Sequence, residues 1–478
     1  MADCELFRTF ASLFAIIGSY MTKILRYFLL LVGFFVALSI EAQSDGTIRG
    51  MHKVKKKETI FGIAKMYGLT IDKLIEANPE MNQPGYELKK GDVIKIPFAS
   101  DASSQPSQTT QPSQTSTTTT NNLDDVRRRE IRVGVMLPLH NINGDGKRMV
   151  EYYRGILMAC DSLKKSGLSF DIHAWNAAED ADVSQILNDP AAAKCDIIFG
   201  PLYSKQMQVL SEFVEHNDIR LVIPFSINAP QLLTNRNIFQ VWQSPTNIND
   251  ATIVHYLEKF KDYHPVFIDC NDSTSKKGIF TSGLRRQLEG RQIEYSITNL
   301  KSGEESFAKA FSQTKPNVVI LNTGRSPELG VAFAKINGLK SNNQSLDITM
   351  FGYTEWLMYT RTHLENFYKF NTYIPSTFYY NVLSSQTGRL EQKYREDFHS
   401  DMQNALPRFA LTGFDHAYFF LKGLHKYGKD FNGAAGMFGY PPVQTPLVFE
   451  RMGNGGLQNH SLLFVHYTPE HRVETVRY

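Results

Sequence analysis

The chain has 478 residues, of which 42% are hydrophobic and 12% aromatic, enough to build the cores of two or three domains. Lysine and arginine number 51 against 48 aspartate and glutamate residues, so the formal charge is only +3. A protein dedicated to nucleic acids usually has a strongly basic surface, and the near balance argues against that class of partner.

The N-terminal segment predicts export. Residues 21–42 begin with Lys23 and Arg26, continue through an apolar run at 27–38 and reach Ala42, a small residue at the expected cut. The signal is complete from Met21, so residues 1–20 are interpreted as a misassigned upstream extension. The alternative is an uncleaved anchor, because residues 24–40 are just long enough to span a bilayer. Either way, we expect a periplasmic or cell-envelope protein of a bacterium.

The cysteines predict neither a metal site nor a redox motif. Cys4, Cys160, Cys195 and Cys270 form no C-x-x-C pair, and no Cys/His grouping has zinc-ligand spacing. We therefore expect no metal and no cofactor. Buried free thiols are the preferred interpretation, and a disulfide between two of the last three cysteines stays open.

Three zones follow the signal. Residues 50–98 form a compact patterned block, and residues 129–478 alternate strand-like and helical segments. Between them, residues 99–128 form a linker rich in Ser, Thr, Gln and Pro. The linker is nearly devoid of apolar residues, so it cannot bury enough surface to fold and is expected to be flexible.

The alternation in the large zone predicts an α/β fold. Apolar runs of the parallel-strand type lie at 131–139, 170–177, 195–200, 219–226, 265–270, 293–298, 317–324 and 348–353. Segments with helical spacing separate them at 146–167, 182–188, 204–216, 249–262, 278–289, 304–313 and 327–339. Repeated β-α-β units imply parallel sheets covered by helices on both faces. Two such sets predict two lobes, with chain crossovers near 245 and again near 350.

The small block begins with "HKVKKKETIFGIAKMYG" (52–68), which reads as a short strand and then a helix capped by Thr59 and ended by Gly68. A second helix and a closing strand "VIKIP" (93–97) complete a β-α-α-β unit. The block resembles the LysM domain, a module that binds N-acetylglucosamine-containing glycans such as peptidoglycan and chitin. The matching residues are 52–54, 58–65, 67–70, 74–78 and 88–97.

The LysM resemblance implies a sugar groove between the loop before the first helix and the loop after the second. Its residues here are Glu58, Thr59, Ile60 and Phe61 on one side and Asn78, Pro79 and Glu80 on the other. Alternatives stay open, because Thr59 also serves as a helix cap and Asn78 as a residue of a helix-end turn. The sequence departs from the family at Lys57-Glu58, where a glycine is usual. The lysines of the first strand are interpreted as a solvated edge.

The segment "GPLYSKQMQVLSEFVEHNDIRLVIPFSINAP" and its continuation to residue 251 resemble the type 1 periplasmic binding proteins of the branched-chain amino-acid receptor kind. The likeness extends through "VVILNTGRSPELG", "ITMFGYTEW" and "LTGFDHAYFFLKGL". It implies a two-lobed fold that traps a small molecule between its lobes. The whole chain is then a LysM module, a linker and this larger domain.

That resemblance also implies a set of cleft residues. Loop hydroxyls and amides would meet a ligand carboxylate, an acidic residue would meet its ammonium, and aromatic residues would wall the cleft. The residues in these places are Ser204, Ser226, Ile227, Asn228, Glu355, Tyr203 and Trp356. Local capping is an alternative for both serines, and plain surface charge is one for Glu355.

Two departures affect the expected ligand. The positions where the family has aromatic residues hold Lys276-Lys277-Gly278 and Arg325. These changes disfavour an apolar amino acid and suit an anionic ligand or none.

No catalytic motif supports an enzyme. The chain lacks G-x-S-x-G, H-E-x-x-H, Walker A and G-x-G-x-x-G patterns, and two S-x-x-K matches have no companion motifs. We expect a non-catalytic protein that binds peptidoglycan and a small amino-acid-like or cell-wall-derived molecule, in the manner of amino acid transport receptors. The alternative is a scaffold or regulator of peptidoglycan synthesis, whose degenerate cleft binds an envelope protein partner.

Overall fold

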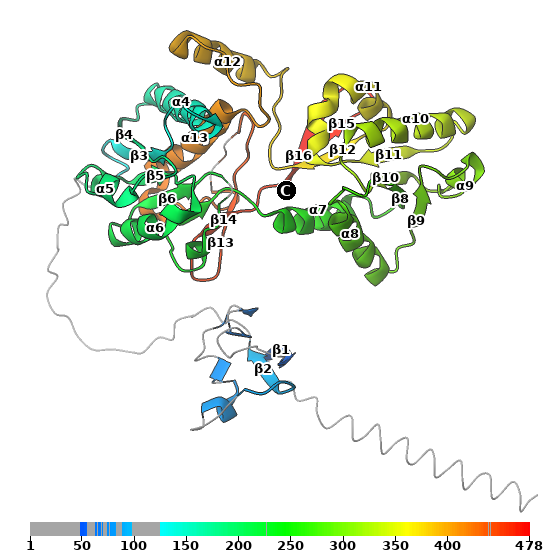
Figure 1. Ribbon diagram of the computed structural model, residues 1–478, viewed down its shortest axis with the longest axis horizontal. Helices are drawn as coiled ribbons and strands as arrows, with labels where there is room; N and C mark the ends of the chain where they lie inside the picture. The colour runs from blue at the N-terminus through cyan, green and yellow to red at the C-terminus, as the bar shows by residue number, and fades with distance from the viewer. Residues whose placement is uncertain are drawn as a thin grey trace, which may run out of the picture. The chain divides into compact units, whose positions relative to one another are not determined.

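The computed structural model describes part of the chain (Figure 1). The described residues are 48–54, 63–64, 66–67, 69, 74–75, 77–82, 88–97, 125–225, 227–437, 439 and 441–478. They fall into two compact units that divide between Ser116 and Thr117. The predicted segments 1–20 and 21–42, and residues 99–124 of the predicted linker, lie outside the described residues.

The first unit is a small module around an antiparallel strand pair. β1 (Ile48–Lys53) pairs with β2 (Val93–Pro97), and the 3-10 helix η1 (Pro79–Asn82) lies between them in sequence. Helical residues occur at 63–64 and 74–75. The core of the module consists of Val54, Ile63, Ala64, Leu69, Leu74, Met81, Ile94 and Ile96. Lys53 is exposed, as expected of a solvated strand edge.

Lobe 1 of the second unit is a helix-covered sheet with the strand order β13-β14-β7-β6-β5-β3-β4, parallel except for the β13–β14 hairpin. Its elements are β3 (Ile131–Leu137), α4 (Gly144–Lys164), β4 (Phe170–Asn176), α5 (Val183–Leu187), η3 (Ala192–Lys194), β5 (Ile197–Phe199), η4 (Ser204–Gln206), α6 (Met207–His216), β6 (Arg220–Ile223), η5 (Pro230–Leu233), β7 (Ile238–Gln240), α12 (Ser385–Phe398), α13 (Phe409–Tyr427), η7 (Gly428–Asp430), β13 (Phe449–Arg451) and β14 (Leu457–Asn459).

Lobe 2 is built in the same way, with the strand order β16-β15-β12-β11-β10-β8-β9. Strands β15 and β16 run antiparallel to their neighbours and the others are parallel. Its elements are α7 (Pro245–Lys259), β8 (His264–Asp269), α8 (Gly278–Gly290), β9 (Ser296–Asn299), α9 (Glu304–Ala308), β10 (Asn317–Leu321), α10 (Ser326–Asn342), β11 (Ile348–Phe351), η6 (Thr354–Tyr359), α11 (Thr360–Lys369), β12 (Tyr373–Ser376), β15 (Leu463–Tyr467) and β16 (Val473–Arg477).

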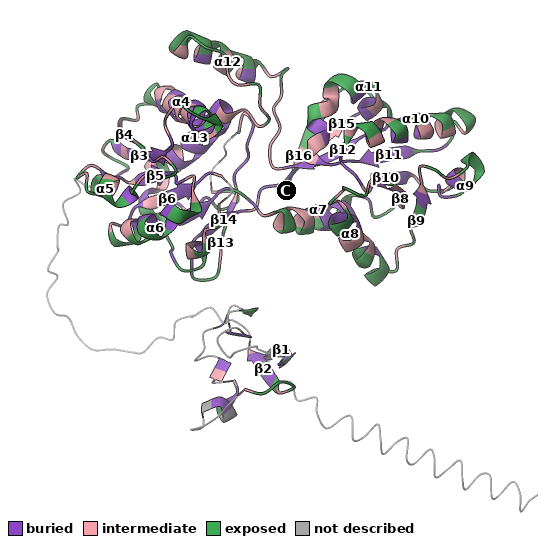
Figure 2. Cartoon of the chain, viewed as in Figure 1, coloured by how far each residue is buried: buried purple, intermediate pink, exposed green. Residues whose placement is uncertain are grey.

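The two lobes confirm the predicted α/β class. Central strands are buried along their whole length, as β10 shows at residues 317–321, because helices cover both faces of each sheet (Figure 2). The short strands of Figure 2 accordingly run in purple through the middle of each lobe, with green on the outward faces of the helices. The second unit therefore has the predicted two-lobed architecture, with one helix-covered, mainly parallel sheet in each lobe.

The chain passes between the lobes three times within residues 125–478, at 241–244, 377–384 and 460–462. The first passage is close to the predicted crossover near 245. The second lies later than the predicted position near 350, because β12 still pairs with β11 in the sheet of lobe 2. Hydrogen bonds from buried side-chain amides join the first and third passages. Gln243 Nε2 donates to the Ser461 carbonyl at 2.7 Å, and Asn459 Nδ2 donates to the Val241 carbonyl at 3.2 Å.

Glycines let α4 and α13 pack closely on lobe 1. A Cβ atom on Gly155 would lie 2.0 Å from the carbonyl oxygen of Ala410, and one on Gly413 would lie 2.0 Å from that of Tyr152. These distances are far below van der Waals contact, so only glycine allows the observed approach. The close approach brings the side chains of Tyr152 and His416 together.

The three described cysteines are free and buried, which confirms the preferred interpretation of Cys160, Cys195 and Cys270. Burial raises the pKa of each thiol to about 12. Across the described part of the chain, no helix combines the length and apolar character needed to cross a membrane.

Candidate functional site

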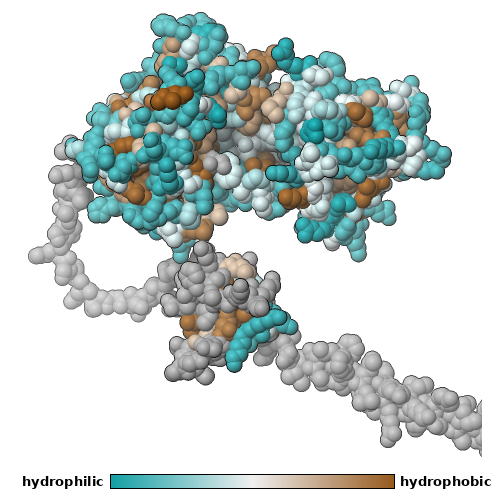
Figure 3. Space-filling view, viewed as in Figure 1, coloured by the Kyte–Doolittle hydropathy of each residue, from teal (hydrophilic) through white to brown (hydrophobic). Residues whose placement is uncertain are grey.

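Adjoining cavities lie where the two lobes face each other (Figure 3), in the hollow bordered by hydrophobic surface. The lobe-2 cavity has a volume of about 430 Å³ and the lobe-1 cavity about 450 Å³. Both are within the usual size range of small-molecule sites. They share Trp242, Gln243, Ile248 and Phe378, so they form one continuous cleft beside the crossing strands.

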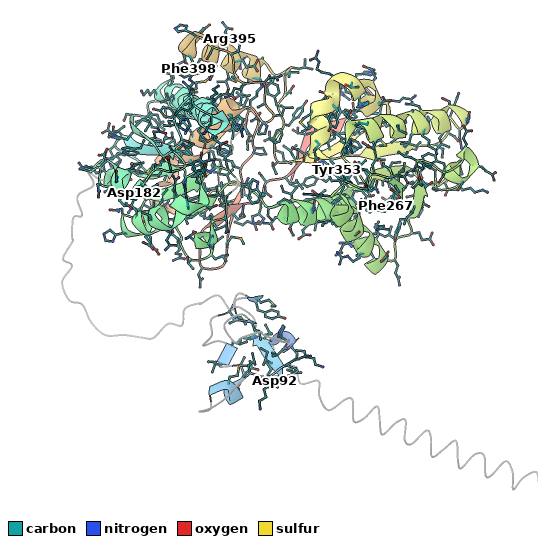
Figure 4. All side chains as sticks on the ribbon, viewed as in Figure 1. Asp92, Asp182, Phe267, Tyr353, Arg395 and Phe398 are labelled. Atoms are coloured by element: carbon teal, nitrogen blue, oxygen red, sulfur yellow. The ribbon has the colours of Figure 1, made fainter. Side chains whose placement is uncertain are left out.

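The lobe-2 cavity contains an internal ion pair. Lys277 Nζ lies 2.6 Å from Glu355 Oε1 and 4.6 Å from the ring centroid of Tyr353, which is labelled in Figure 4. Lys277 precedes α8 and Glu355 lies in the first turn of η6, so both follow the carboxyl ends of strands. Glu355 Oε2 is buried without a hydrogen-bond partner.

Glu355 was predicted to meet the ammonium group of a ligand. A carboxylate beside an aromatic ring is the environment that an ammonium group prefers. Here the ammonium comes from the protein itself, from one of the lysines that replace the expected aromatic. The carboxylate lines the cleft as predicted, but its nearer oxygen is already paired.

Arg325 lies outside both cavities. Its Nη1 is 3.5 Å from Asp272 Oδ1, and its Nε is 3.6 Å from Glu328 Oε2. The Asp272 carboxylate also accepts from the hydroxyls of Thr274 at 2.6 Å and Thr323 at 2.7 Å. Those hydrogen bonds, with the nearby guanidinium, lower the pKa of Asp272 to about 2. Arg325 therefore belongs to a local cluster that ties the loops after β8 and β10 together.

Trp356 does not wall the cleft, contrary to the prediction. Its side chain is fully buried in the core of lobe 2, where it stacks on Phe367 with ring centroids 6.0 Å apart. A Cβ atom on Gly352 would lie 2.3 Å from the Trp356 ring, so the preceding backbone packs directly on the indole. The residue supports the floor of the lobe and is inaccessible to a ligand.

Four of the predicted residues of lobe 1 lie in the loops beside the cleft and line neither cavity: Tyr203, Ser204, Ile227 and Asn228. Ser204 Oγ accepts a hydrogen bond from the Asn228 backbone at 2.8 Å, which joins the loop after β5 to the loop after β6. Tyr203 OH donates to Asp145 Oδ2 at 3.5 Å, and burial raises its pKa. Ile227 packs partly buried on the neighbouring hydrophobic cluster. Ser226 lies outside the described residues.

Most residues that line the lobe-1 cavity are not among the site residues predicted from the sequence. Its apolar lining is Met149, Leu202, Pro224, Phe225, Val241, Trp242, Ile248, Phe378, Pro407 and Phe409. Its polar lining is Asp145, Arg148, Gln243, Thr377, Thr412, His416, Thr445 and Asn459. One signal could have found His416: the dipeptide Asp415-His416 interrupts an otherwise apolar stretch of α13 that is buried on every side.

In the small module, Asn78 has a structural role that departs from the predicted sugar contact. Its side chain is buried, with Nδ2 donating to the carbonyls of Leu74 and Lys95 and Oδ1 accepting from the Lys95 backbone at 2.7 Å. It thereby fastens the end of the second helical segment to β2. Pro79 is exposed next to it. The residues Glu58, Thr59, Ile60 and Phe61 and the side chain of Glu80 lie outside the described residues.

Comparison with known proteins identifies the small module. Residues 52–97 match the family model of the LysM domain, so this segment is a LysM domain. A search of curated protein sequences finds no match for the chain.

Several solved structures are similar to the larger domain. A putative branched-chain amino acid ABC transporter from Rhodospirillum rubrum is 13% identical, with a TM-score of 0.49, over 73% of this chain and 100% of that one. Full-length LpoA from Haemophilus influenzae is 13% identical, with a TM-score of 0.46, over 73% and 59%. A periplasmic ligand-binding protein of a branched chain amino acid ABC transporter from Burkholderia xenovorans is 14% identical, with a TM-score of 0.43, over 73% and 94%.

Proposed function

We propose that this is a non-catalytic bacterial envelope protein that holds N-acetylglucosamine-containing glycan, peptidoglycan above all, through its LysM domain and binds a ligand in the cleft between its lobes. The LysM match over residues 52–97 carries the first half of the proposal. The continuous interlobe cleft, with its adjoining cavities of about 430 and 450 Å³, supports the second half. LysM modules and two-lobed binding folds are typically non-catalytic, which agrees with the lack of catalytic motifs in the sequence.

Sedimentation with purified peptidoglycan tests the first half. The full chain should pellet with peptidoglycan, and soluble N-acetylglucosamine oligomers should release it. Pro79→Arg places a long charged side chain beside the predicted groove and should weaken pelleting. Lys90→Ala changes another exposed residue of the same module and serves as the matched control. Pelleting that survives deletion of residues 50–98 would contradict the assignment.

The cleft contents test the second half. Native mass spectrometry of the full chain, purified from an envelope fraction without refolding, should show an added mass that is lost on denaturation. A free α-amino acid is not the expected ligand, because Lys277 already provides the ammonium that pairs with Glu355. The amino acid transport role implied by resemblance is weakened for the same reason.

A second function is favoured by one specific observation. The polar groups expected to meet a ligand are bonded within the protein: Glu355 to Lys277, and Ser204 to Asn228. Such a cleft suits a regulator of peptidoglycan synthesis that binds an envelope protein instead of a small molecule. Cross-linking in intact cells distinguishes the two functions, because a regulator yields a defined protein adduct while native mass spectrometry shows an empty cleft.

A further inference from the structure

The lobe-1 cavity is a mostly apolar chamber whose polar residues are nearly all satisfied. Asp145 and Arg148 pair with each other at 3.6 Å. Thr412 Oγ1 donates to the Arg408 carbonyl and accepts from Gln444 Nε2. The charged side chains at the wall therefore compensate each other. A ligand with a net charge would lose its hydration without gaining an unpaired partner there.

Two lining groups are the exceptions. Among the described side chains that line the cavity, His416 Nε2 and Thr445 Oγ1 are the buried polar atoms without any hydrogen-bond partner. His416 is 1% exposed and Thr445 is 9% exposed. Both line the same cavity, and the Thr445 backbone donates at 2.7 Å to the carboxylate of Asp415, the residue before His416. An unsatisfied buried polar group costs about 1–3 kcal/mol of stability. Two such atoms in one cavity wall indicate that a bound ligand supplies their hydrogen-bond partner.

The state of His416 decides what that partner must offer. Burial lowers the pKa of His416 to about 3, so the imidazole is neutral. Its Nδ1 lies 3.0 Å from the hydroxyl of Tyr152, which is fully buried and has no other acceptor among the described residues. The phenol is the stronger donor of the two groups, so it donates to Nδ1 and leaves the ring proton on Nε2. Nε2 then requires an acceptor oxygen.

We propose that the lobe-1 cavity binds an uncharged, largely apolar molecule that carries one acceptor oxygen, such as a carbonyl, directed at His416 and Thr445. This inference rests on the proposed ligand-binding role of the cleft and names the chemical class of the ligand. Apolar contacts come from both lobes, since Phe409 belongs to α13 of lobe 1 and Ile248 to α7 of lobe 2. The bound molecule therefore stabilises one arrangement of the lobes.

Two neutral fluorescent probes test the proposal with the full chain. Prodan is a naphthyl ketone with an acceptor oxygen, and N-phenylnaphthylamine is a similar apolar molecule without one. Both should bind saturably with a blue shift of emission, and prodan should bind more tightly. Ile248→Trp fills the cleft from lobe 2 and should abolish binding of both probes. Val254→Trp adds the same side chain at an exposed position of the same helix and should leave binding unchanged.

Variants at the polar pair test the acceptor oxygen. His416→Phe and Thr445→Val keep the shape of the cavity wall and remove the unpaired atoms. Each should weaken prodan binding by about fivefold, the value of one neutral hydrogen bond, while binding of N-phenylnaphthylamine stays constant. Constant binding of that second probe also shows that each variant is folded. Equal loss of both probes, or no change in prodan, would overturn the assignment.

The same measurements separate this inference from the proposed function. If charged amino acids bind by calorimetry and the naphthyl probes do not, the cleft binds ligands but the apolar class is wrong. If neither kind binds while the chain still pellets with peptidoglycan, the inference and the cleft half of the proposed function both fail, and the LysM half stands.

Discussion

Lys277 and Glu355 form an ion pair inside the cleft, with Nζ 2.6 Å from Oε1, although 78 positions separate them in sequence. The lysine ammonium also lies over the ring of Tyr353. The protein thus places its own cation against the carboxylate and ring that would otherwise receive a ligand amine. On the proposed ligand-binding role, the ion pair would exclude an amine from this part of the lobe-2 cavity.

Removing the ammonium should open that cavity to amines. In Lys277→Met, Glu355 loses its partner while Oε2 already lacks one, so an added alkylammonium ion or α-amino acid should bind and raise the melting temperature in scanning fluorimetry. Because both side chains are partly exposed, the substitution should cost only about 0–1 kcal/mol of stability. Lys276→Met alters the exposed neighbour and should gain no binding. Equal responses of both variants to the amine would contradict the role of Lys277.

Asp272 should make stability depend on acidic pH. Its pKa is lowered from 3.8 to about 2 in the folded state, chiefly by the Thr274 and Thr323 hydroxyls. A depressed folded pKa adds stability above the unfolded value, and this contribution is lost as the pH falls from about 4 to about 2. Asp272→Asn should therefore be less stable than the natural protein at pH 7, and the difference should shrink below pH 4.

Urea unfolding at several pH values measures this effect. Asp262→Asn, at an exposed carboxylate in lobe 2, provides the matched control. A difference between Asp272→Asn and the natural protein that persists undiminished at pH 2 would show that the hydrogen bonds of Asp272 do not depend on its ionisation.

The contact between α4 and α13 should tolerate no side chain at Gly155 or Gly413. Gly155→Ala places a methyl group 2.0 Å from the Ala410 carbonyl oxygen, so the helices must separate. We expect a loss of about 1–3 kcal/mol or more in the free energy of unfolding. Gly338→Ala in α10 meets no atom within 4 Å and should stabilise the protein by about 0.5–1 kcal/mol. Thermal unfolding of both variants measures the contrast, and similar effects would contradict it.

Asn78 should act on the stability of the LysM domain and only indirectly on glycan binding. Asn78→Ala removes the side chain that bonds to Leu74 and Lys95, and leaves buried backbone groups unpaired at a cost of about 1–3 kcal/mol. Peptidoglycan pelleting should be normal at low temperature and should fail at a lower temperature than for the natural protein. Loss of pelleting at every temperature, with the module still folded, would instead indicate direct contact.

Pattern-level features were predictable because they depend on local periodicity. The strand at 317–321 is apolar from Val318 to Leu321, and the helix at 326–342 repeats its apolar residues at helical spacing. The hydrophobic effect acts on these patterns whatever the partners are, so the α/β class and the two lobes followed from them. The LysM module was identified by its resemblance to that family. Glu355 was placed at the cleft by the resemblance to periplasmic binding proteins, and in the structure it follows the end of β11.

The roles of individual side chains were decided by tertiary packing. Trp356 lies one residue from Glu355 yet points into the core, where Phe367 fills the space beside it. Arg325 is held by Asp272, and His416 meets Tyr152 only because glycines bring two helices together.

The sequence alone therefore determined that a LysM-like block precedes a two-lobed α/β domain, and it favoured buried thiols over a disulfide. Only the tertiary structure decided that Lys277 occupies the expected ammonium site and that His416 and Thr445 face an apolar chamber. The physical reason is that the buried face of a strand or helix shows in the sequence as apolar residues repeated every two to four positions. An ion pair or a cavity depends instead on the directions and distances between residues that are far apart in the chain.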